Sequence, residues 1–344
     1  MALDLQKLRG KEILVTGGCG FIGSEVAKQL SDLGSIVTII DNLSSGKEEY
    51  VQNLKNVECV IGDICNKDDV AKVMKNKDYV INLAALPFIP DSYNMPMQFF
   101  DVNVNATINL IMAMRSEKSL KRFTHISSSE IYGSARFSPM TENHPTIPQS
   151  TYAVSKLAGE RVAYTMYKEH NVPTVIIRPF NSFGPNITQP YIIPEIISQL
   201  LNGKNELELG NIHSRRDLTF VEDTARAIIS SLVAEGVIGE TINVGSERSV
   251  TIKELVHLIA NIFSRDVTIK IDSSRLRPHD VEALICDYGK AKRLLSWEPT
   301  ISIKEGLKRT VDWAKENQIK LKAPFKGWTS SYRENFKQMN DKHD

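Results

Sequence analysis

Two residues whose side chains could take part in catalysis, Tyr152 and Lys156, lie four positions apart in the segment YAVSKLAGE. In a helix this spacing places both side chains on one face. A tyrosine hydroxyl, with a reference pKa near ~10, is a poor base at neutral pH, and a nearby positive charge favours its phenolate form. The pair is therefore a candidate for removing a proton from a substrate hydroxyl, with Tyr152 as the base.

A glycine-rich loop near the N-terminus is the second candidate site. Gly17, Gly20 and Gly23 form the pattern G-x-x-G-x-x-G, with Phe21 and Ile22 inside it, directly after a β-branched apolar run. Glycine permits a tight turn and lets the backbone approach a diphosphate closely. The helix that follows would present free N–H groups to the phosphates. The pattern therefore predicts a dinucleotide-binding loop.

An acidic residue, Asp41, ends the second predicted strand. A carboxylate at this place can bind both hydroxyls of the adenosine ribose and would repel a 2′-phosphate. No arginine stands beside it, so the sequence favours NAD over NADP as the cofactor. Asp63, after the third predicted strand, is placed to contact the adenine edge. The neighbouring Asn42 and Ile64 complete this part of the predicted cofactor site.

Hydroxyl and carboxyl groups follow a third buried run. The predicted strand Phe123–Ser127 is followed directly by Ser128, Ser129 and Glu130. Substrates of parallel sheets bind outside the carboxyl ends of the strands. These three residues are therefore candidates for contacting the substrate beside Tyr152 and Lys156.

Apolar runs alternate with helix-period stretches through the first half of the chain. Continuous apolar strands separated by helices predict a parallel sheet covered on both faces, the doubly wound α/β arrangement of the Rossmann type. The predicted strands are Glu12–Thr16, Ile36–Asp41, Val57–Ile61, Tyr79–Leu83, Phe123–Ser127 and Thr174–Arg178, and the predicted helices are Ile22–Leu33, Lys67–Lys75, Met97–Arg115 and Tyr152–His170.

The pattern changes after residue 179, where loops rich in Pro, Asn and Gly begin. We expect residues 1–179 to form the NAD-binding domain, with segments near 213–246 returning to it. Residues 180–319 are expected to form mainly a smaller substrate-binding lobe. We expect the polar segment 320–344 to form a C-terminal tail.

Composition excludes several classes of protein. The chain has 344 residues and a net charge of +1, which gives no support for a nucleic-acid or membrane-surface partner. No apolar run approaches the roughly 18–20 residues that span a bilayer, and the N-terminus has no apolar signal core. The four cysteines form no C-x-x-C pair and no His lies at ligand spacing from them, so no metal site is expected. We expect a cytoplasmic protein.

Taken together, these motifs resemble the extended short-chain dehydrogenase/reductase family, the nucleotide-sugar epimerases, dehydratases and decarboxylases. The resemblance covers roughly residues 10–317 and adds Leu83, Ala84 and Ala85 to the expected cofactor contacts. The motifs that carry it are the glycine loop, Asp41, Asn82-Leu83-Ala84-Ala85, Ser127–Gly133, Tyr152 with Lys156, and Arg178-Pro179-Phe180-Asn181-Ser182-Phe183-Gly184-Pro185.

The resemblance implies a role for each matching residue. Ser128 matches the residue that hydrogen-bonds the sugar 4-hydroxyl, Tyr152 the base, and Lys156 the residue that activates the tyrosine and holds the nicotinamide ribose. On the substrate side, Asn181 matches a residue that holds the diphosphate of the sugar nucleotide. Two arginines match further contacts to the nucleotide and its diphosphate, a use that suits the planar guanidinium fork. They are Arg216 and Arg277.

The resemblance also implies a shared first step, in which Tyr152 takes the 4-hydroxyl proton while NAD takes the hydride from C4. A 4-epimerase needs no further base, whereas a 4,6-dehydratase needs a base for the C5 proton, and Glu130 is the candidate. Dehydratases of the dTDP-glucose type carry Asp-Glu where this chain has Ser129-Glu130. That departure leaves the acid for the leaving 6-hydroxyl open between Tyr152, Glu130 and water.

Two stretches of sequence bear on the choice between dehydratase, epimerase and decarboxylase. SSSEIYGSA and RLRPHDVEALICDYGKAKRLLSWEP are similar to dehydratases acting on nucleotide-linked N-acetylglucosamine. UDP-glucuronate decarboxylases typically have Gly-Pro-Arg where this chain has Gly184-Pro185-Asn186. We therefore favour a 4,6-dehydratase of a nucleotide-linked N-acetylhexosamine, with a 4-epimerase or a decarboxylase as alternatives. A non-catalytic NAD-binding scaffold would typically lack the Tyr or the Lys.

Members of this family often dimerise through a four-helix bundle. Met97–Arg115 and Ser150–His170 would supply the helices here, and the resemblance therefore implies a homodimer. The apolar residues that we expect to be available for this contact are Ile111, Met112, Val162 and Met166.

Overall fold

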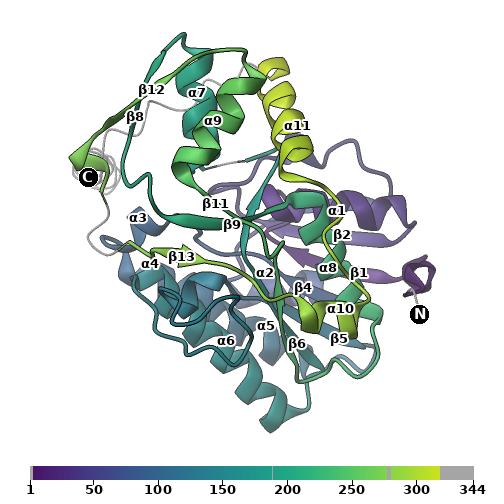
Figure 1. Cartoon of the computed structure of the whole chain (residues 1–344). Coiled ribbons are helices and arrows are strands. Elements are labelled where there is room, and N and C mark those ends of the chain that lie inside the picture. The colour runs from purple at the N-terminus through teal and green to yellow at the C-terminus, as the bar shows by residue number, and fades with distance from the viewer. Residues whose placement is uncertain (1–2, 188, 277–279, 318–344) are drawn as a thin grey trace, which may run out of the picture.

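The structure, a computed structural model, describes residues 3–187, 189–276 and 280–317 (Figure 1). Its centre is a seven-stranded parallel sheet with the order β10-β6-β5-β4-β1-β2-β3. This confirms the predicted doubly wound, Rossmann-type sheet. The strands are β1 Glu12–Thr16, β2 Ile36–Asp41, β3 Val57–Ile61, β4 Tyr79–Asn82, β5 Arg122–Ile126, β6 Thr174–Pro179 and β10 Thr241–Val244.

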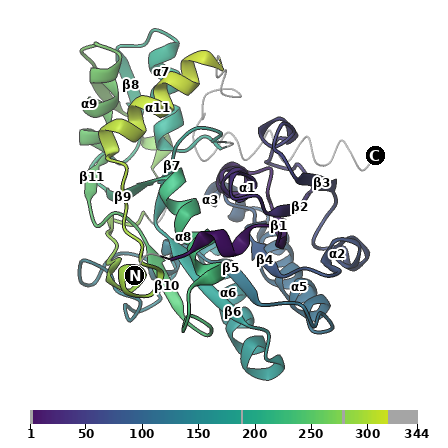
Figure 2. The ribbon, with the colours of Figure 1, turned by 90° about the vertical axis from the view of Figure 1, so that its right-hand side faces the viewer.

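Helices cover both faces of the sheet (Figure 2). Successive residues of a strand point to opposite faces, so Ile13 packs into one core while Leu14 packs into the other. The first core lies under α1 Phe21–Asp32 and α8 Val221–Val233. The second lies under α2 Lys67–Met74, α5 Ala106–Met114 and α6 Thr151–His170.

The predicted helix Met97–Arg115 is interrupted. It consists of α4 Pro96–Phe100, a π-helical turn Asp101–Asn105 and then α5. The turn lies against α6, where a Cβ added to Gly159 would come within 2.3 Å of the Asn103 carbonyl oxygen. The Asn103 side chain also donates to Ser155 Oγ at 2.8 Å. Close approach of α6 at its glycine thus accommodates the wider turn, a feature that often marks functional regions.

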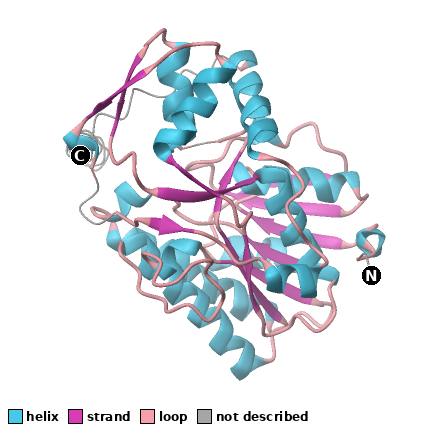
Figure 3. Cartoon of the chain, viewed as in Figure 1, coloured by secondary structure: helices cyan, strands magenta, loops and turns pink. Residues whose placement is uncertain are grey.

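A second, smaller lobe forms the other end of the molecule (Figure 3). Its apolar core lies between α7 Ile192–Leu201, α9 Ile252–Ile262 and α11 Ile303–Glu316. Short strands complete it: β9 pairs with β7, β11 and β13, and β8 pairs with β12. These strands are β7 Asn181–Phe183, β8 Glu206–Leu209, β9 Arg215–Phe220, β11 Ser249–Thr251, β12 Thr268–Ile271 and β13 Ala283–Leu284.

The chain passes between the two parts more than once. Of the segment near 213–246, α8 and β10 belong to the large sheet and its layers, whereas β9 belongs to a small sheet of the lobe. The returning segments expected near 213–246 are thus α8 and β10, and β9 lies in the lobe. Its inner side chains Leu218 and Phe220 lie in the apolar core of the lobe, which explains why it pairs there.

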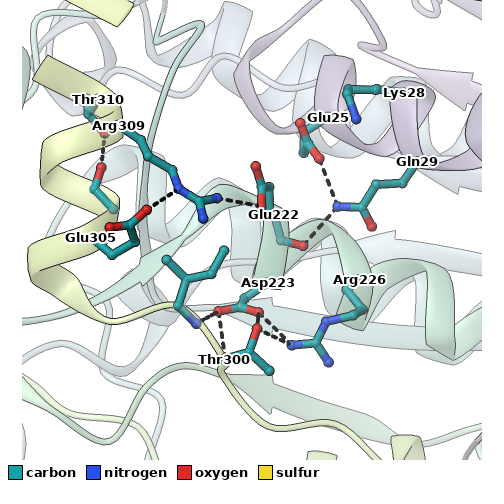
Figure 4. Close-up of polar contacts among 12 residues, drawn as sticks. Glu25, Lys28, Gln29, Glu222, Asp223, Arg226, Thr300, Glu305, Arg309 and Thr310 are labelled. Carbon is teal, nitrogen blue, oxygen red and sulfur yellow. Dashed lines mark hydrogen bonds and ion pairs between the residues drawn. The ribbon is translucent and has the colours of Figure 1, made fainter. Parts of the chain in front are cut away.

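A polar seam ties the cofactor-side helix to the lobe (Figure 4). Gln29 of α1 donates to the Glu222 carbonyl at 3.0 Å, and the Glu222 carboxylate meets Arg309 of α11 at 3.3 Å. Next to it, the Asp223 carboxylate accepts hydrogen bonds from the backbone and hydroxyl of Thr300. The first turn of α8 therefore connects α1, which begins at the glycine loop, with the chain that enters α11.

Two of the residues expected to be available for a dimer contact, Ile111 and Met166, are buried in the second core of their own chain. That part of the expectation is wrong, because α5 and α6 turn these side chains toward the sheet. Met112, in contrast, is 46% exposed. No helix within the described ranges combines the length and apolar character needed to cross a membrane.

Candidate active site

A cavity of about 440 Å³ opens at the carboxyl ends of the central strands and continues into the lobe. Every predicted site residue that the structure describes lines it, and Arg277 lies outside the described residues. The lining residues that the sequence predicted are Gly17, Gly20, Phe21, Ile22, Gly23, Asp41, Asn42, Asp63, Ile64, Leu83, Ala84, Ala85, Ser128, Ser129, Glu130, Tyr152, Lys156, Asn181 and Arg216.

The glycine loop forms a cradle that larger residues would fill. Gly17 has φ +68°, and a Cβ there would lie 2.7 Å from the backbone nitrogen of Ala84. A Cβ on Gly23 would lie 2.1 Å from the Gly17 carbonyl oxygen. Because α1 begins at Phe21 directly after this turn, its free N–H groups lie beside the cradle. The arrangement fits a diphosphate.

Asp41 stands at the carboxyl end of β2 with 8% of its surface exposed. Its Oδ2 accepts a hydrogen bond from the Cys19 backbone and its Oδ1 accepts one from the Leu43 backbone, both at 2.9 Å. Each oxygen keeps a second lone pair for a ribose hydroxyl. Asn42 donates to Asp63 Oδ2 at 3.1 Å, which joins the ends of β2 and β3 at the same part of the cavity.

Tyr152 lies in the first turn of α6, where Ser150 caps the helix by accepting from the Ala153 backbone at 3.1 Å. Burial raises the pKa of Tyr152 to about 12, the charge of Glu130 adds to this, and a hydrogen bond with Ser128 works against it. The protein alone therefore keeps the phenol protonated at neutral pH. A further positive charge in the cavity is needed to form the phenolate.

Lys156 lies one turn further along α6 and donates to the Ile126 carbonyl at the end of β5. Burial lowers its pKa to about 8, while the nearby Glu160 carboxylate works in the opposite direction. At neutral pH most of the side chain is therefore an ammonium group. Its bond to β5 fixes α6 against the strand that carries the serines.

Ser128 and Glu130 reach the same cavity from the end of β5. Ser128 caps a short 3-10 helix, Ser129–Tyr132, by accepting from the Glu130 backbone at 3.2 Å. Glu130 is 9% exposed and lines the cavity. Its charge acts on the pKa of Tyr152, so a carboxylate, a serine hydroxyl and a phenol converge on one space.

Behind these groups lies an ion pair that the sequence analysis missed. Arg178, near the end of β6, donates to both oxygens of Glu160, at 2.8 and 2.6 Å. It also donates to the Tyr132 hydroxyl at 2.6 Å, which donates to Asn243 at 2.7 Å. The sequence did contain a signal that could have drawn attention to Glu160, because this residue follows Lys156 by one helical turn on the same face of α6.

The lobe supplies further lining residues. Arg216 of β9 donates to the Val281 carbonyl at 2.8 Å and forms an ion pair with Asp280 at 3.3 Å. The side-chain oxygen of Asn181 is buried without a hydrogen-bond partner among the described residues. A buried acceptor at a cavity wall is a place where a ligand donor is expected. Glu195 and Arg275, which the sequence analysis did not select, line the same end of the cavity.

Comparison with known proteins places this arrangement in a family. Residues 14–310 match the family described as GDP-mannose 4,6 dehydratase. The chain belongs to this family of nucleotide-sugar dehydratases and epimerases. Its members are extended short-chain dehydrogenases/reductases, as the motifs indicated, and homologous enzymes of the family use NAD.

Relatives in the family are named for different reactions. A UDP-N-acetyl-alpha-D-glucosaminuronate decarboxylase of Bacillus cytotoxicus is 31% identical over 89% of this chain and 98% of its own. A dTDP-glucose 4,6-dehydratase of Streptomyces niveus is 30% identical over 91% and 96%. The crystal structure of a UDP-glucuronic acid 4-epimerase from Bacillus cereus, with UDP-glucuronic acid and NAD, has a TM-score of 0.83 at 30% identity over 89% and 99%. Family membership therefore does not identify the reaction, which has to be inferred from the side chains that line the cavity.

Proposed function

We propose that this chain is an NAD-dependent 4,6-dehydratase of a nucleotide-linked N-acetylhexosamine. The observation that carries the proposal is the position of Glu130, whose carboxylate lines the cavity and acts electrostatically on Tyr152. An epimerase needs no base beyond the tyrosine, whereas elimination across C5 and C6 requires one for the C5 proton. Glu130 gives this cavity that second base.

The cofactor half of the cavity fits NAD on three counts. The cradle of Gly17 and Gly23 suits the diphosphate, the fixed carboxylate of Asp41 suits the adenosine ribose, and Lys156 lies where it can hold the second ribose. When bound, NAD⁺ supplies the hydride acceptor and a positively charged ring that lowers the pKa of a nearby phenol. The negative charge of Asp41 disfavours a 2′-phosphate.

The protein's own groups then act in turn. Ser128 hydrogen-bonds the sugar 4-hydroxyl, and Tyr152 removes its proton as C4 is oxidised. The resulting ketone makes the C5 proton acidic, and Glu130 removes it. The C6 hydroxyl leaves as water after taking a proton, and Tyr152, Glu130 and a water molecule are the candidate donors. With NAD bound, a hydride would be returned to C6 while C5 takes a proton, for which protonated Glu130 is the candidate donor; the product would then be a 4-keto-6-deoxy sugar.

A decarboxylase would need a cation for the substrate carboxylate. After Gly184-Pro185 this chain has Asn186, whose side chain donates to Ser24 at 3.5 Å. The positively charged residues among the described cavity lining are Lys156, Arg216 and Arg275. The two arginines already face carboxylates, those of Asp280 and Glu195. This distribution of charge favours a sugar without a carboxylate.

The N-acetylhexosamine part of the proposal rests on sequence similarity. SSSEIYGSA and the segment that follows RLRPHD resemble dehydratases of such sugars, and one relative is named for a nucleotide-linked N-acetylated sugar acid. The homodimer through α4–α6 also stays a prediction. Met97, Met112 and Val154, which are 69%, 46% and 40% exposed, are large apolar side chains that these helices expose.

Mass spectrometry of products tests the reaction. The protein is incubated with UDP-GlcNAc, GDP-GlcNAc, dTDP-glucose, GDP-mannose and UDP-glucuronate in turn. Loss of water from an N-acetylhexosamine nucleotide is the expected result. Loss of carbon dioxide, or an unchanged mass with a new epimer, would contradict the proposal.

The variant Glu130→Gln tests the second base. We expect C4 oxidation to survive, seen as the near-ultraviolet absorbance of reduced nicotinamide, while exchange of the C5 proton with deuterated solvent and loss of water both fall roughly 10²-fold or more. Glu169→Gln, an exposed Glu on α6 outside the cavity, is the matched control. Normal elimination by Glu130→Gln would show that the assigned role of Glu130 is wrong.

A further inference from the structure

The far end of the cavity contains a polar pair that the proposed chemistry does not use. Glu195 of α7 and Arg275, at the end of the short 3-10 helix Ser273–Arg275, both line this end. Apolar Leu209 and Ile252 and polar Asn211 also line the cavity, and Gly210 lies against Arg275. The glycine loop and Asp41 take the cofactor and Tyr152 takes the sugar. This end, beyond Arg216, is therefore left for the base of the substrate nucleotide.

The pair is held firmly and stays almost dry. Arg275 Nη1 lies 2.9 Å from Glu195 Oε1, and the two side chains are 9% and 7% exposed. Gln199 donates to the same Oε1 at 2.9 Å. Among the described residues, the hydrogen bonds to this carboxylate all end on Oε1, which leaves Oε2 as an acceptor at the cavity wall. The backbone of Arg275 also packs closely against Gly210, because a Cβ added to this glycine would lie 2.6 Å from the Arg275 carbonyl oxygen.

A buried carboxylate discriminates between bases because it can only accept hydrogen bonds. Guanine presents two adjacent N–H donors, N1–H and the 2-amino group, beside the O6 acceptor. Uracil and thymine present a single N–H between two carbonyl oxygens, and a carboxylate would face those oxygens unfavourably. A site built for particular donors rejects an analogue that lacks them, since its buried polar groups are then unpaired.

We infer that Glu195, positioned by Arg275, selects guanine, so that the substrate is a guanosine-diphosphate sugar. The inference rests on the proposed nucleotide-sugar function and narrows it. The relatives described above are named for UDP- and dTDP-linked sugars, so the assignment comes from this carboxylate and not from them. Asp280, which is paired with Arg216, remains for contacts nearer the ribose and diphosphate.

Binding of nucleoside diphosphates to the NAD-loaded full chain tests the inference without any substitution. Calorimetry with GDP, inosine diphosphate, UDP and dTDP is the measurement. GDP should bind roughly tenfold or more tightly than UDP or dTDP, with inosine diphosphate between them because it lacks only the 2-amino donor. If UDP or dTDP binds as tightly as GDP, the inference is wrong. If none of the four binds, the nucleotide-sugar function itself is wrong.

The variant Glu195→Gln assigns the preference to this side chain. Its amide keeps the size of the carboxylate but presents an N–H₂ group. The affinity for GDP should therefore fall roughly tenfold, while the affinity for UDP should change little or rise. Glu208→Gln is the matched control, because Glu208 lies nearby on β8, outside the cavity and ion-paired to Lys270. Equal weakening of GDP and UDP by Glu195→Gln would overturn the inference, since the carboxylate would then serve the ribose or the fold.

Discussion

The two ends of the cavity are built in different ways. At the sheet end, the polar groups stand on parallel strands and on the 20-residue helix α6, and the ion pair behind them, Glu160 with Arg178, is 0% and 3% exposed. At the lobe end, the ion pairs line the cavity themselves. Arg216 and Asp280 are 10% and 18% exposed, and Arg275 and Glu195 come from elements far apart in the sequence.

This difference suggests a division of labour. Backbone that is fixed by seven paired strands keeps a proton donor and acceptor in one geometry, which proton transfer requires. Side-chain pairs on short strands and loops can be exchanged without disturbing that geometry. We therefore expect substitutions at the sheet end to change kcat or stability, and substitutions at the lobe end to change the affinity for the nucleotide.

The largest effect is expected from Tyr152→Phe. Loss of the hydroxyl removes the base for the 4-hydroxyl proton, so kcat should fall roughly 10²–10⁴-fold. The ring would still pack edge-on against Phe99, with ring centroids 6.3 Å apart, so the melting temperature should hardly change. Steady-state kinetics and thermal unfolding measure the two effects.

Tyr132→Phe is the matched control for that substitution. Burial raises the pKa of Tyr132 to about 12, as it does for Tyr152, but its hydroxyl is bonded to Arg178 and Asn243. Removing it leaves buried partners unsatisfied, at a cost of about 1–3 kcal/mol in unfolding free energy. A large loss of kcat with unchanged stability would contradict the structural role given to Tyr132.

Glu160→Gln should have the next largest effect, on stability. It leaves Arg178 as a buried charge without its ionised partner, which typically costs about 3–5 kcal/mol. Urea unfolding at neutral pH measures this. Asp32→Asn, which breaks the exposed pair of Lys28 and Asp32, should cost under ~1 kcal/mol. Similar costs for the two variants would remove the contrast between dry and solvated pairs.

The same ion pair predicts a pH dependence. Burial raises the pKa of Glu160, but hydrogen bonds and charge from Arg178 outweigh this and bring it to about 2, below its unfolded value. The stabilisation is therefore complete above the unfolded pKa and is lost as pH falls toward about 2. The difference in unfolding free energy between wild type and Glu160→Gln should shrink over that acidic range.

How far the sequence could predict the structure also differs between the two ends. β1 to β3 end where the sequence analysis placed them, because continuous apolar runs and the glycine loop mark a parallel sheet locally. Ser128 and Tyr152 belong to motifs within one such unit each. Glu195 and Arg275, in contrast, are separated in the sequence by β8, α9 and β12, among other elements, and no local spacing relates them.

The smallest of these effects, on binding alone, is expected from Arg216→Lys. Lysine keeps the positive charge near Asp280 but lacks the fork that binds phosphate oxygens and the Val281 carbonyl together. KM for the nucleotide sugar should rise roughly tenfold while kcat stays within about threefold, because Tyr152 and Glu130 stand on elements that Arg216 does not hold. Arg226→Lys, outside the cavity and paired with Asp223, is the matched control. A fall in kcat as large as that of Tyr152→Phe would show that the lobe end also sets the geometry of the chemistry, and the division of labour between the two ends would then be wrong.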